Sequence, residues 1–136
     1  MRVFLDANVL FTAAHNPGGK ASLVIELGSK GCWSLLSSRY ASEEARRNLV
    51  RKFPHCVHRL DEMQTSIRVV GHQPTHPYPK GLAAKDQPIF QAALASKATH
   101  LLTGDLKDFG AFMNKPDETF GILVQTVAEF LGSLDE

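Results

Sequence analysis

Short apolar stretches recur along the chain and alternate with segments of helical periodicity. Val3-Phe4-Leu5 contains no polar residue, which is typical of a strand buried on both faces of a parallel sheet. On the same pattern, we expect strands over residues 3–5, 33–36, 67–70, 99–102 and 122–124.

Helical spacing is clearest between residues 20 and 30, where apolar or small residues recur at positions i, i+3, i+4 and i+7. Pro54 ends the next predicted helix, whereas Pro88 fits only in the first turn of a later one. We expect helices over residues 9–14, 20–30, 39–53, 55–66, 86–94, 105–112 and 126–134, the last with a capping box at its start. The proline-rich stretch 72–79 is expected to form an exposed loop.

Strands that alternate with helices predict an α/β fold, here a three-layer α/β/α sandwich with a central parallel sheet. The length fits one domain of ordinary size, spanning residues 1–136. In such sheets the functional crevice lies at the carboxyl ends of the strands, near the point where the strand order reverses. Polar residues that directly follow a strand are therefore the first candidates for a site.

Composition narrows the choice of partners. The formal net charge of +1 predicts no strong overall attraction to nucleic acid or membrane, so any nucleic-acid binding must use a local patch. Cys32 and Cys56 form no recognisable disulfide framework. The amino-terminal apolar run is too short for a signal peptide or a membrane span. We expect a soluble cytoplasmic protein with reduced thiols and no membrane contact.

Acidic residues are found at several predicted strand ends and helix starts. The candidates are Asp6, Glu43 or Glu44, Asp86, Asp105 and Asp108. If they share one crevice, two unit charges about 4 Å apart repel by roughly 4 kcal/mol at an effective dielectric constant of about 20. A divalent cation removes this repulsion, and a set of oxygen ligands without thiolate or imidazole suits Mg²⁺ or Mn²⁺.

Helix capping is the simpler explanation for most of these acids taken singly. Carboxylates near a helix amino terminus accept hydrogen bonds from free N–H groups and complement the helix dipole. This explanation suits Asp86, Asp105 and the Glu43/Glu44 pair, but it suits Asp6 less well because Asp6 directly follows a buried strand. The joint occurrence of these acids favours a shared metal site.

Four segments, in order, carry a family resemblance. They are FLDANVL at residues 4–10, SRYASEEARRNL at 38–49, the acid Asp86, and THLLTGDLKD at 99–108. Together they resemble the PIN-domain family, a nuclease fold found in VapC-like toxins of bacterial toxin–antitoxin pairs. Residues 55–79 match no motif of that family, which leaves substrate selection open.

The resemblance implies a metal-dependent endoribonuclease that hydrolyses RNA phosphodiester bonds, as the toxin of a toxin–antitoxin pair. The implied catalytic acids are Asp6, Glu44, Asp86 and Asp105, with Glu43 as the rival of Glu44. The implied ligands of Mg²⁺ or Mn²⁺ are Asp6, Asp86, Asp105 and Asp108. Asn8 and Thr103 are uncharged supports that can fix these carboxylates, although a simple turn or cap explains Asn8 equally well. The implied partners are RNA, a cognate antitoxin protein and a second copy of the chain in a homodimer.

Basic side chains near the acids can hold RNA phosphates. The candidates are Arg47, Arg51, Lys52 and Lys107, with Lys85 as a further candidate beside the acids. Arg47 and Arg51 are four residues apart and share a helix face. The simpler alternative is a solvated face on which Glu43 pairs with Arg46 or Arg47, with each pair contributing a few tenths of a kcal/mol.

Three other interpretations compete. A zinc site could draw on His55, Cys56, His58, His72 and His76, but the prolines exclude a HExxH helix and no Cys-x-x-Cys partner is present. A receiver-type phosphotransfer domain has a suitable length, yet Asp6-Ala7-Asn8 lacks the paired acids expected at its first strand end. A PIN-like module that binds RNA or a partner without cleavage is the third, and we expect such a module to have lost at least one acid.

Overall fold

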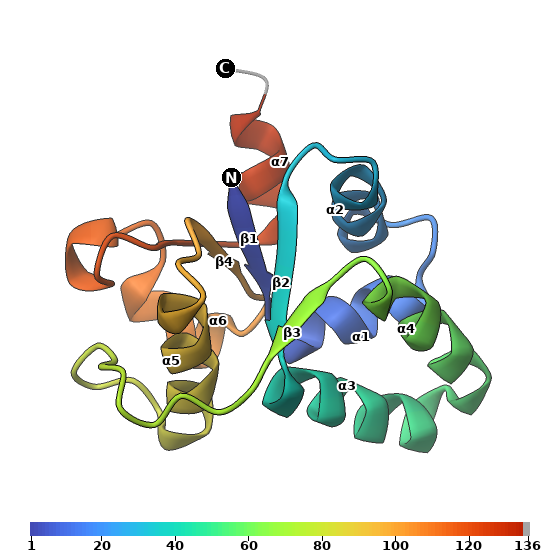
Figure 1. Ribbon diagram of the computed structural model, residues 1–136, viewed down its shortest axis with the longest axis horizontal. Coiled ribbons are helices and arrows are strands. Elements are labelled where there is room, and N and C mark those ends of the chain that lie inside the picture. The colour runs from blue at the N-terminus through green and yellow to red at the C-terminus, as the bar shows by residue number, and fades with distance from the viewer. Residues whose placement is uncertain (135–136) are drawn as a thin grey trace.

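The computed structural model of the chain describes residues 1–134. A sheet of five parallel strands lies between two layers of helices (Figure 1). The strands are β1 (Arg2–Leu5), β2 (Ser34–Ser38), β3 (Arg68–Val70), β4 (His100–Leu102) and β5 (Leu123–Gln125). This architecture confirms the predicted three-layer α/β/α sandwich.

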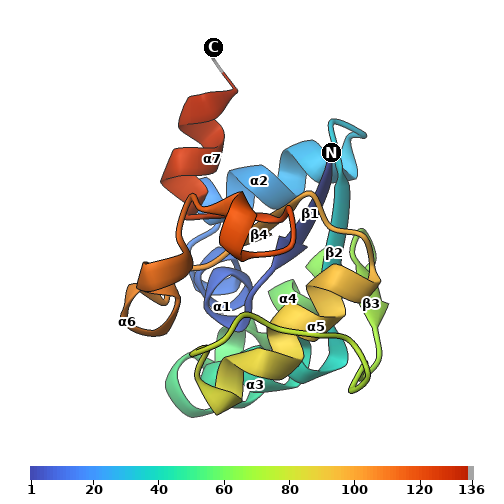
Figure 2. The ribbon, with the colours of Figure 1, turned by 90° about the vertical axis from the view of Figure 1, so that its left-hand side faces the viewer.

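Helices cover both faces and one end of the sheet. They are α1 (Ala7–His15), α2 (Lys20–Ser29), α3 (Arg39–Lys52), α4 (Val57–Gln64), α5 (Gln87–Ala95), α6 (Leu106–Phe109) and α7 (Val127–Ser133). α1, α2 and α4 lie on one side of the sheet, and α5 and α6 lie on the other (Figure 1 and Figure 2). α3 contacts both α1 and α5, so it crosses the carboxyl ends of the strands between the two layers.

The strand order is β3-β2-β1-β4-β5. The chain therefore moves in one direction across the sheet from β1 to β3 and in the other direction from β4 to β5. The order reverses between β1 and β4, which is where ligands bind in open α/β sheets. Receiver domains have the order 2-1-3-4-5, so the observed topology argues against that alternative.

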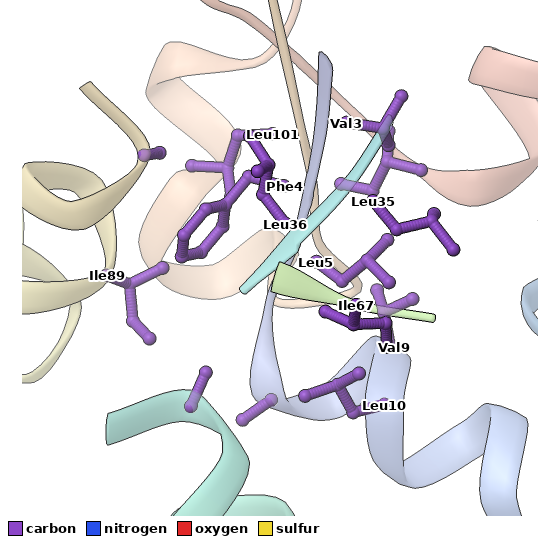
Figure 3. Close-up of a cluster of buried hydrophobic side chains, with 14 of the residues drawn as sticks. Val3, Phe4, Leu5, Val9, Leu10, Leu35, Leu36, Ile67, Ile89 and Leu101 are labelled. Atoms are coloured by element: carbon purple, nitrogen blue, oxygen red, sulfur yellow. The ribbon is translucent and has the colours of Figure 1, made fainter. Parts of the chain in front are cut away.

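The register of the strands determines which side chains share a face of the sheet. Phe4 lies opposite Leu36 and Leu101, and these three side chains pack on the side of Ile89 in α5 (Figure 3). The other face is filled by Val3, Leu5, Val9, Leu10, Leu35 and Ile67. Burial of a side chain of this size stabilises the fold by about 1.5–3 kcal/mol. Together these residues hold the strand ends that present the acids.

The predicted elements are all present, with shifted boundaries. β2 begins after Trp33 and continues through Ser37, whose hydroxyl donates to Leu5 O at 2.8 Å and is thereby satisfied although buried. Ser38 caps α3 by accepting the Ala41 N–H at 3.0 Å. The predicted helices over 55–66 and 105–112 each contain a separate 3₁₀ turn, at Pro54–Cys56 and Gly110–Phe112 respectively.

The cysteines and the character of the helices complete the description of the fold. Cys32 is exposed and Cys56 is buried, and both are free thiols. None of the helices within residues 1–134 has the length and apolar character that a bilayer-spanning segment requires.

Candidate metal centre

Asp6 is anchored at the carboxyl end of β1 by hydrogen bonds to both carboxylate oxygens. The Ala7 N–H donates to Oδ1 at 2.7 Å, and the Thr103 hydroxyl donates to Oδ2 at 2.7 Å. Asn8 Nδ2 also donates to Oδ2, at 3.2 Å. Burial raises the pKa of Asp6 above its usual value, while the bonds from Thr103 and Ala7 act in the opposite direction. The carboxyl group is therefore held in one orientation at the rim of the sheet.

Asn8 and Thr103 connect the segment after β1 to the segment after β4. Asn8 Oδ1 accepts the Gly104 N–H at 2.6 Å, and Thr103 Oγ1 accepts the Asp105 N–H at 3.0 Å. Gly104 permits this approach, because a Cβ atom there would lie 3.2 Å from Asn8 Oδ1. These contacts fix Asp6 and Asp105 relative to each other, which a simple turn or cap at Asn8 would not do.

Asp86 lies at the start of α5, yet its side chain makes no capping hydrogen bond. Its Oδ2 atom is buried and has no hydrogen-bond partner within residues 1–134. Burial first, and then the charge of Asp6, raises the pKa of Asp86 to about 7. An unpaired buried carboxylate oxygen destabilises a fold. Capping therefore does not explain why an acid occupies this position.

Asp105 and Asp108 share the ammonium group of Lys85. Lys85 Nζ lies 3.1 Å from Asp105 Oδ2 and 3.0 Å from Asp108 Oδ2. Partial burial acts to raise the pKa of Asp105, but the hydrogen bonds from Lys85 and from the Asp108 N–H keep it below its usual value. The hydrogen bonds to Asp108 and Asp105 raise the pKa of Lys85, so the ammonium group stays charged at neutral pH.

Glu43 and Glu44 line different hollows, although they are neighbours on α3. Glu44 lines the hollow that contains Asp86, together with Asn48 one helical turn further on. Glu43 lines a separate hollow beside His72. Neither residue is in the first turn of α3, so the capping explanation does not apply to them. The geometry favours Glu44 over Glu43 as the acid of this helix.

The acids meet at a hollow of about 350 Å³ on the carboxyl edge of the sheet. We call it the acidic hollow, and it is lined by Asp6, Asn8, Glu44, Asn48, Lys85, Asp86, Gly104 and Asp105. Carboxylate oxygens of Asp86, Asp105 and Asp108 lie within 4.8 Å of one another. Within residues 1–134 this is the one group of three or more possible metal ligands, and Asp6 lies beside it rather than in it.

This donor set fits Mg²⁺ or Mn²⁺. Every acidic donor is a carboxylate oxygen, and hard divalent cations prefer such ligands. The unpaired Oδ2 of Asp86 is an independent indication, because an ion at this place would give it a partner. The residues considered for zinc do not converge in the same way: His55, Cys56, His58, His72 and His76 form no ligand group in the described part of the chain.

The predicted phosphate contacts on α3 lie outside the acidic hollow. Arg51 contacts a residue that lines the hollow, because its Nη2 donates to Asn48 Oδ1 at 3.1 Å. Lys52 Nζ lies 5.8 Å from the ring centroid of Phe11. Arg47 is exposed on the same helix.

Two further basic residues, Arg46 and Lys107, also lie outside the acidic hollow. Arg46 pairs with Asp61 of α4 rather than with Glu43, so the ion pair expected within α3 is replaced by one between two helices. Lys107 is exposed on α6 and makes no ion pair within residues 1–134. The cation that reaches the acidic hollow is instead Lys85.

Sequence reasoning missed Asn48. The available signal was its spacing, since it follows Glu44 by four residues and therefore shares its helix face. An amide side chain gave no chemical reason to choose it over the neighbouring arginines.

Comparison with known proteins identifies the fold. No protein-family model and no curated protein sequence matches the chain. Among solved structures, the chain is similar to a chain of VapBC2 from Rickettsia felis, with a TM-score of 0.64 and 15% identity. That crystal structure contains VapBC2 bound to a DNA fragment from the promoter of its own genes. The similarity covers 93% of this chain and 98% of that one. A chain of VapBC-1 from nontypeable Haemophilus influenzae gives a TM-score of 0.57 and 14% identity, covering 94% and 99%.

In each comparison, the similarity extends over nearly the whole length of this chain and of the matched chain. At this level of identity they establish a shared fold. The PIN-like α/β/α sandwich that the motifs imply is therefore confirmed as the fold of this chain.

Proposed function

We propose that this protein is a Mg²⁺- or Mn²⁺-dependent endoribonuclease that acts at the acidic hollow. The observation that carries the proposal is the convergence of Asp6, Glu44, Asp86 and Asp105 from four segments of the chain on one hollow. Capping leaves Asp86 and Glu44 unexplained, and four acids around one hollow repel one another more than the single ammonium group of Lys85 can offset.

Asp6, Asp86, Asp105 and Asp108 are the residues that would hold the ion. A divalent ion bound there supplies an activated water and a contact for a non-bridging phosphate oxygen. Glu44, across the hollow on α3, orients the attacking water. Asn8 and Thr103 keep the carboxylates of β1 and β4 in place through the hydrogen bonds described above.

Lys85 has a second role in this proposal. Its ammonium group contacts Asp105 and Asp108 at the mouth of the hollow, and its side chain is 59% exposed. A flexible cation at this place can move from the carboxylates to a phosphate of the bound RNA strand. Arg51 contacts the strand further along α3 in this proposal, and its hydrogen bond to Asn48 of the acidic hollow supports this role. Arg47, Lys52 and Lys107 extend the same contact over the surrounding surface.

The biological role we propose is that of a toxin in a toxin–antitoxin pair, with a cognate antitoxin as partner and a homodimer as the working form. The support is the motif resemblance together with the fold shared with chains of VapBC2 and VapBC-1. A growth assay tests the role separately from the chemistry. Expression of the wild-type chain alone should arrest growth, and Asp86→Asn should relieve the arrest. Normal growth with well-expressed wild type would contradict the toxin role.

A cleavage assay tests the activity. Purified protein is incubated with a structured RNA and with a single-stranded RNA in Mg²⁺, in Mn²⁺ and in EDTA. Wild type should cleave in either metal and leave 5′-phosphate ends, whereas Asp6→Asn and Asp105→Asn should lose cleavage and retain their circular dichroism spectra. Asp117→Asn, which changes an exposed acid outside the acidic hollow, is the matched control and should cleave like wild type. Loss of cleavage in Asp6→Asn and Asp105→Asn, purified in the same way, excludes a contaminating nuclease. Equal cleavage by all four proteins would overturn the assignment.

A further inference from the structure

Two hollows at the amino-terminal edge of the sheet share the side chains of Arg2 and Arg68. The larger, of about 600 Å³, extends to Trp33. The smaller, of about 360 Å³, extends to His76 and Lys97. No Asp or Glu is among the lining residues of either one. We call the pair the basic cleft, and it lies at the end of the strands opposite to the acidic hollow.

Strand register places both arginines on one face of the sheet. Arg2 lies opposite Ser34, and Arg68 lies opposite Leu36, two residues further along β2. Side chains in register, or two residues apart on a strand, point to the same face. The strand spacing and rise put the two Cα atoms roughly 12 Å apart, a separation that two arginine side chains can close around one anion.

The positive charge of the basic cleft has no neutralising partner. No carboxylate lies within 4.0 Å of Arg2, Arg68 or Lys97 in the part of the chain that the structure describes. The Arg2 guanidinium is held by Ser96 O, which accepts from Nε at 3.0 Å and from Nη2 at 2.8 Å. A carbonyl fixes the orientation of this group and leaves its full charge in place.

Lys97 occupies a position where glycine is the usual residue. It follows the last turn of α5 with a φ of +59°, and the Ala98 N–H donates to Ala93 O while the Lys97 N–H donates to Leu94 O, both at 3.0 Å. These two bonds define a Schellman motif, whose left-handed residue is most often Gly because a Cβ atom is strained there. The fold retains a cation at this position in spite of the strain.

His76 adds a nitrogen that lacks a partner. Its Nδ1 is buried and makes no hydrogen bond within residues 1–134, while its backbone carbonyl accepts from Gln91 Nε2 at 2.6 Å. The loop that carries His76 is thereby fixed on α5, and His76 is one of the residues that line the smaller hollow.

From these features we propose that the basic cleft binds a phosphate-bearing ligand, either a free nucleotide or an RNA strand. Two arginines and a lysine without carboxylate partners provide the forked and point-charge donors that recognise phosphate. The site is separate from the acidic hollow, and its binding requires neither a metal ion nor hydrolysis.

The only tryptophan of the chain, Trp33, lines the larger hollow of the basic cleft and not the acidic hollow, so its fluorescence is the signal used to follow binding. The protein is titrated in EDTA with ADP and, separately, with a single-stranded oligoribonucleotide. A saturable change in Trp33 fluorescence is expected. Saturation by ADP identifies a nucleotide site, and saturation by the oligoribonucleotide alone identifies an RNA-strand site.

Three variants make the test specific. Arg68→Ala and Lys97→Gly should each weaken binding by about tenfold or more, because each removes a charged hydrogen-bond donor. Lys97→Gly should at the same time raise the melting temperature by relieving the left-handed strain, so its loss of binding cannot be attributed to unfolding. Lys115→Ala, which removes an exposed charge outside the cleft, should bind like wild type. No saturable change with either ligand, or equal loss in Lys115→Ala, would overturn the proposal.

Discussion

The Thr103 hydroxyl donates to Asp6 Oδ2 at 2.7 Å and thereby joins the carboxyl end of β4 to that of β1. The oxygen of that hydroxyl, Thr103 Oγ1, also accepts a hydrogen bond from the Asp105 N–H at 3.0 Å. One buried hydroxyl thus determines how two acids of the candidate metal centre are placed relative to each other. Because β1 and β4 are neighbours where the strand order reverses, this bond lies at the centre of the site.

Replacement of Thr103 by Val should lower metal-dependent cleavage by about 10–100-fold, the usual effect of removing a residue that orients a metal ligand. The variant preserves shape and loses only the hydroxyl, so Asp6 and the Asp105 N–H each lose a partner. The free energy of unfolding should fall by about 1–3 kcal/mol. Cleavage rates as a function of Mn²⁺ concentration, with urea denaturation in parallel, measure both effects.

Thr119→Val is the matched control for loss of a buried hydroxyl. The Thr119 side chain is fully buried and donates to Ile122 O at 2.6 Å, outside the acidic hollow. This variant should lose similar stability and keep its cleavage rate. A comparable loss of cleavage in both variants would mean that activity follows stability and that Thr103 has no special role in positioning.

The pKa of Asp86 leads to a prediction about stability and pH in the absence of metal. Its folded-state pKa of about 7 exceeds the unfolded value of about 3.9, so the folded state binds this proton more tightly. The associated stability is complete below about pH 4 and is lost as the pH rises through about 7. Asp86→Asn carries no such penalty, so its melting temperature should exceed that of wild type at pH 8 and approach it at pH 4.5.

Thermal melts in EDTA at several pH values test this prediction. Mn²⁺ at pH 8 should then raise the melting temperature of wild type and leave Asp86→Asn nearly unchanged, because binding to the folded state stabilises it. Asp117→Asn controls for the loss of one surface acid. The melting-temperature difference between Asp86→Asn and wild type should therefore grow as the pH rises. A difference that does not change with pH would show that ionisation of Asp86 does not destabilise the folded state.

The fold was predictable because its signals are local and mutually consistent. Val3-Phe4-Leu5 has no polar position, which is typical of a strand covered on both faces, and the alternation of such runs with helical segments supports that interpretation. Boundaries were harder where tertiary contacts decide them. Ser37 continues β2 because Leu5 O, on a neighbouring strand, accepts its hydroxyl, and no local pattern contains that information.

The acidic positions were also predictable, but the state of each acid was not. Asp86 and Asp105 both precede helices in the sequence, yet Asp105 caps its helix and Asp86 does not. The difference depends on the path of the backbone, which sequence spacing does not specify. Likewise, Lys85 lies in the 3₁₀ turn Ala84–Asp86 before α5 and contacts Asp105 and Asp108 in the segment after β4, a contact that depends on how the fold brings these two segments together.

Removal of Lys85 should tighten metal binding and weaken binding of RNA. Its ammonium group and a metal ion compete for the same carboxylates, Asp105 and Asp108. The ion pair is exposed on the lysine side, so Lys85→Ala should bind Mn²⁺ only about two- to fivefold more tightly. The KM for RNA should rise, because the cation that contacts phosphate is gone.

Calorimetric titration with Mn²⁺ and steady-state cleavage at saturating Mn²⁺ separate these two effects. Lys107→Ala removes a cation from the adjacent helix without loss of an ion pair in the described part of the chain, and it should leave the affinity for Mn²⁺ unchanged. Weaker Mn²⁺ binding in Lys85→Ala would show that the lysine supports the site rather than competing for it.

Glu43 and Glu44 offer the sharpest comparison, because the same change can be made at adjacent positions of one helix. Successive residues of a helix point about 100° apart, and the structure places Glu44 on the acidic hollow and Glu43 on a hollow beside His72. Glu44→Gln should lower the turnover number by about 100-fold or more, within the range expected for a residue that positions or deprotonates an attacking water. The turnover number of Glu43→Gln should remain within about twofold of wild type, as for other surface changes.

Both variants should melt within a few degrees of wild type, so a difference in cleavage reports chemistry rather than folding. A larger loss of activity in Glu43→Gln than in Glu44→Gln would show that Glu43 is the catalytic acid of α3. Full activity in both variants would show that α3 contributes no catalytic acid, and the site would then consist of Asp6, Asp86, Asp105 and Asp108.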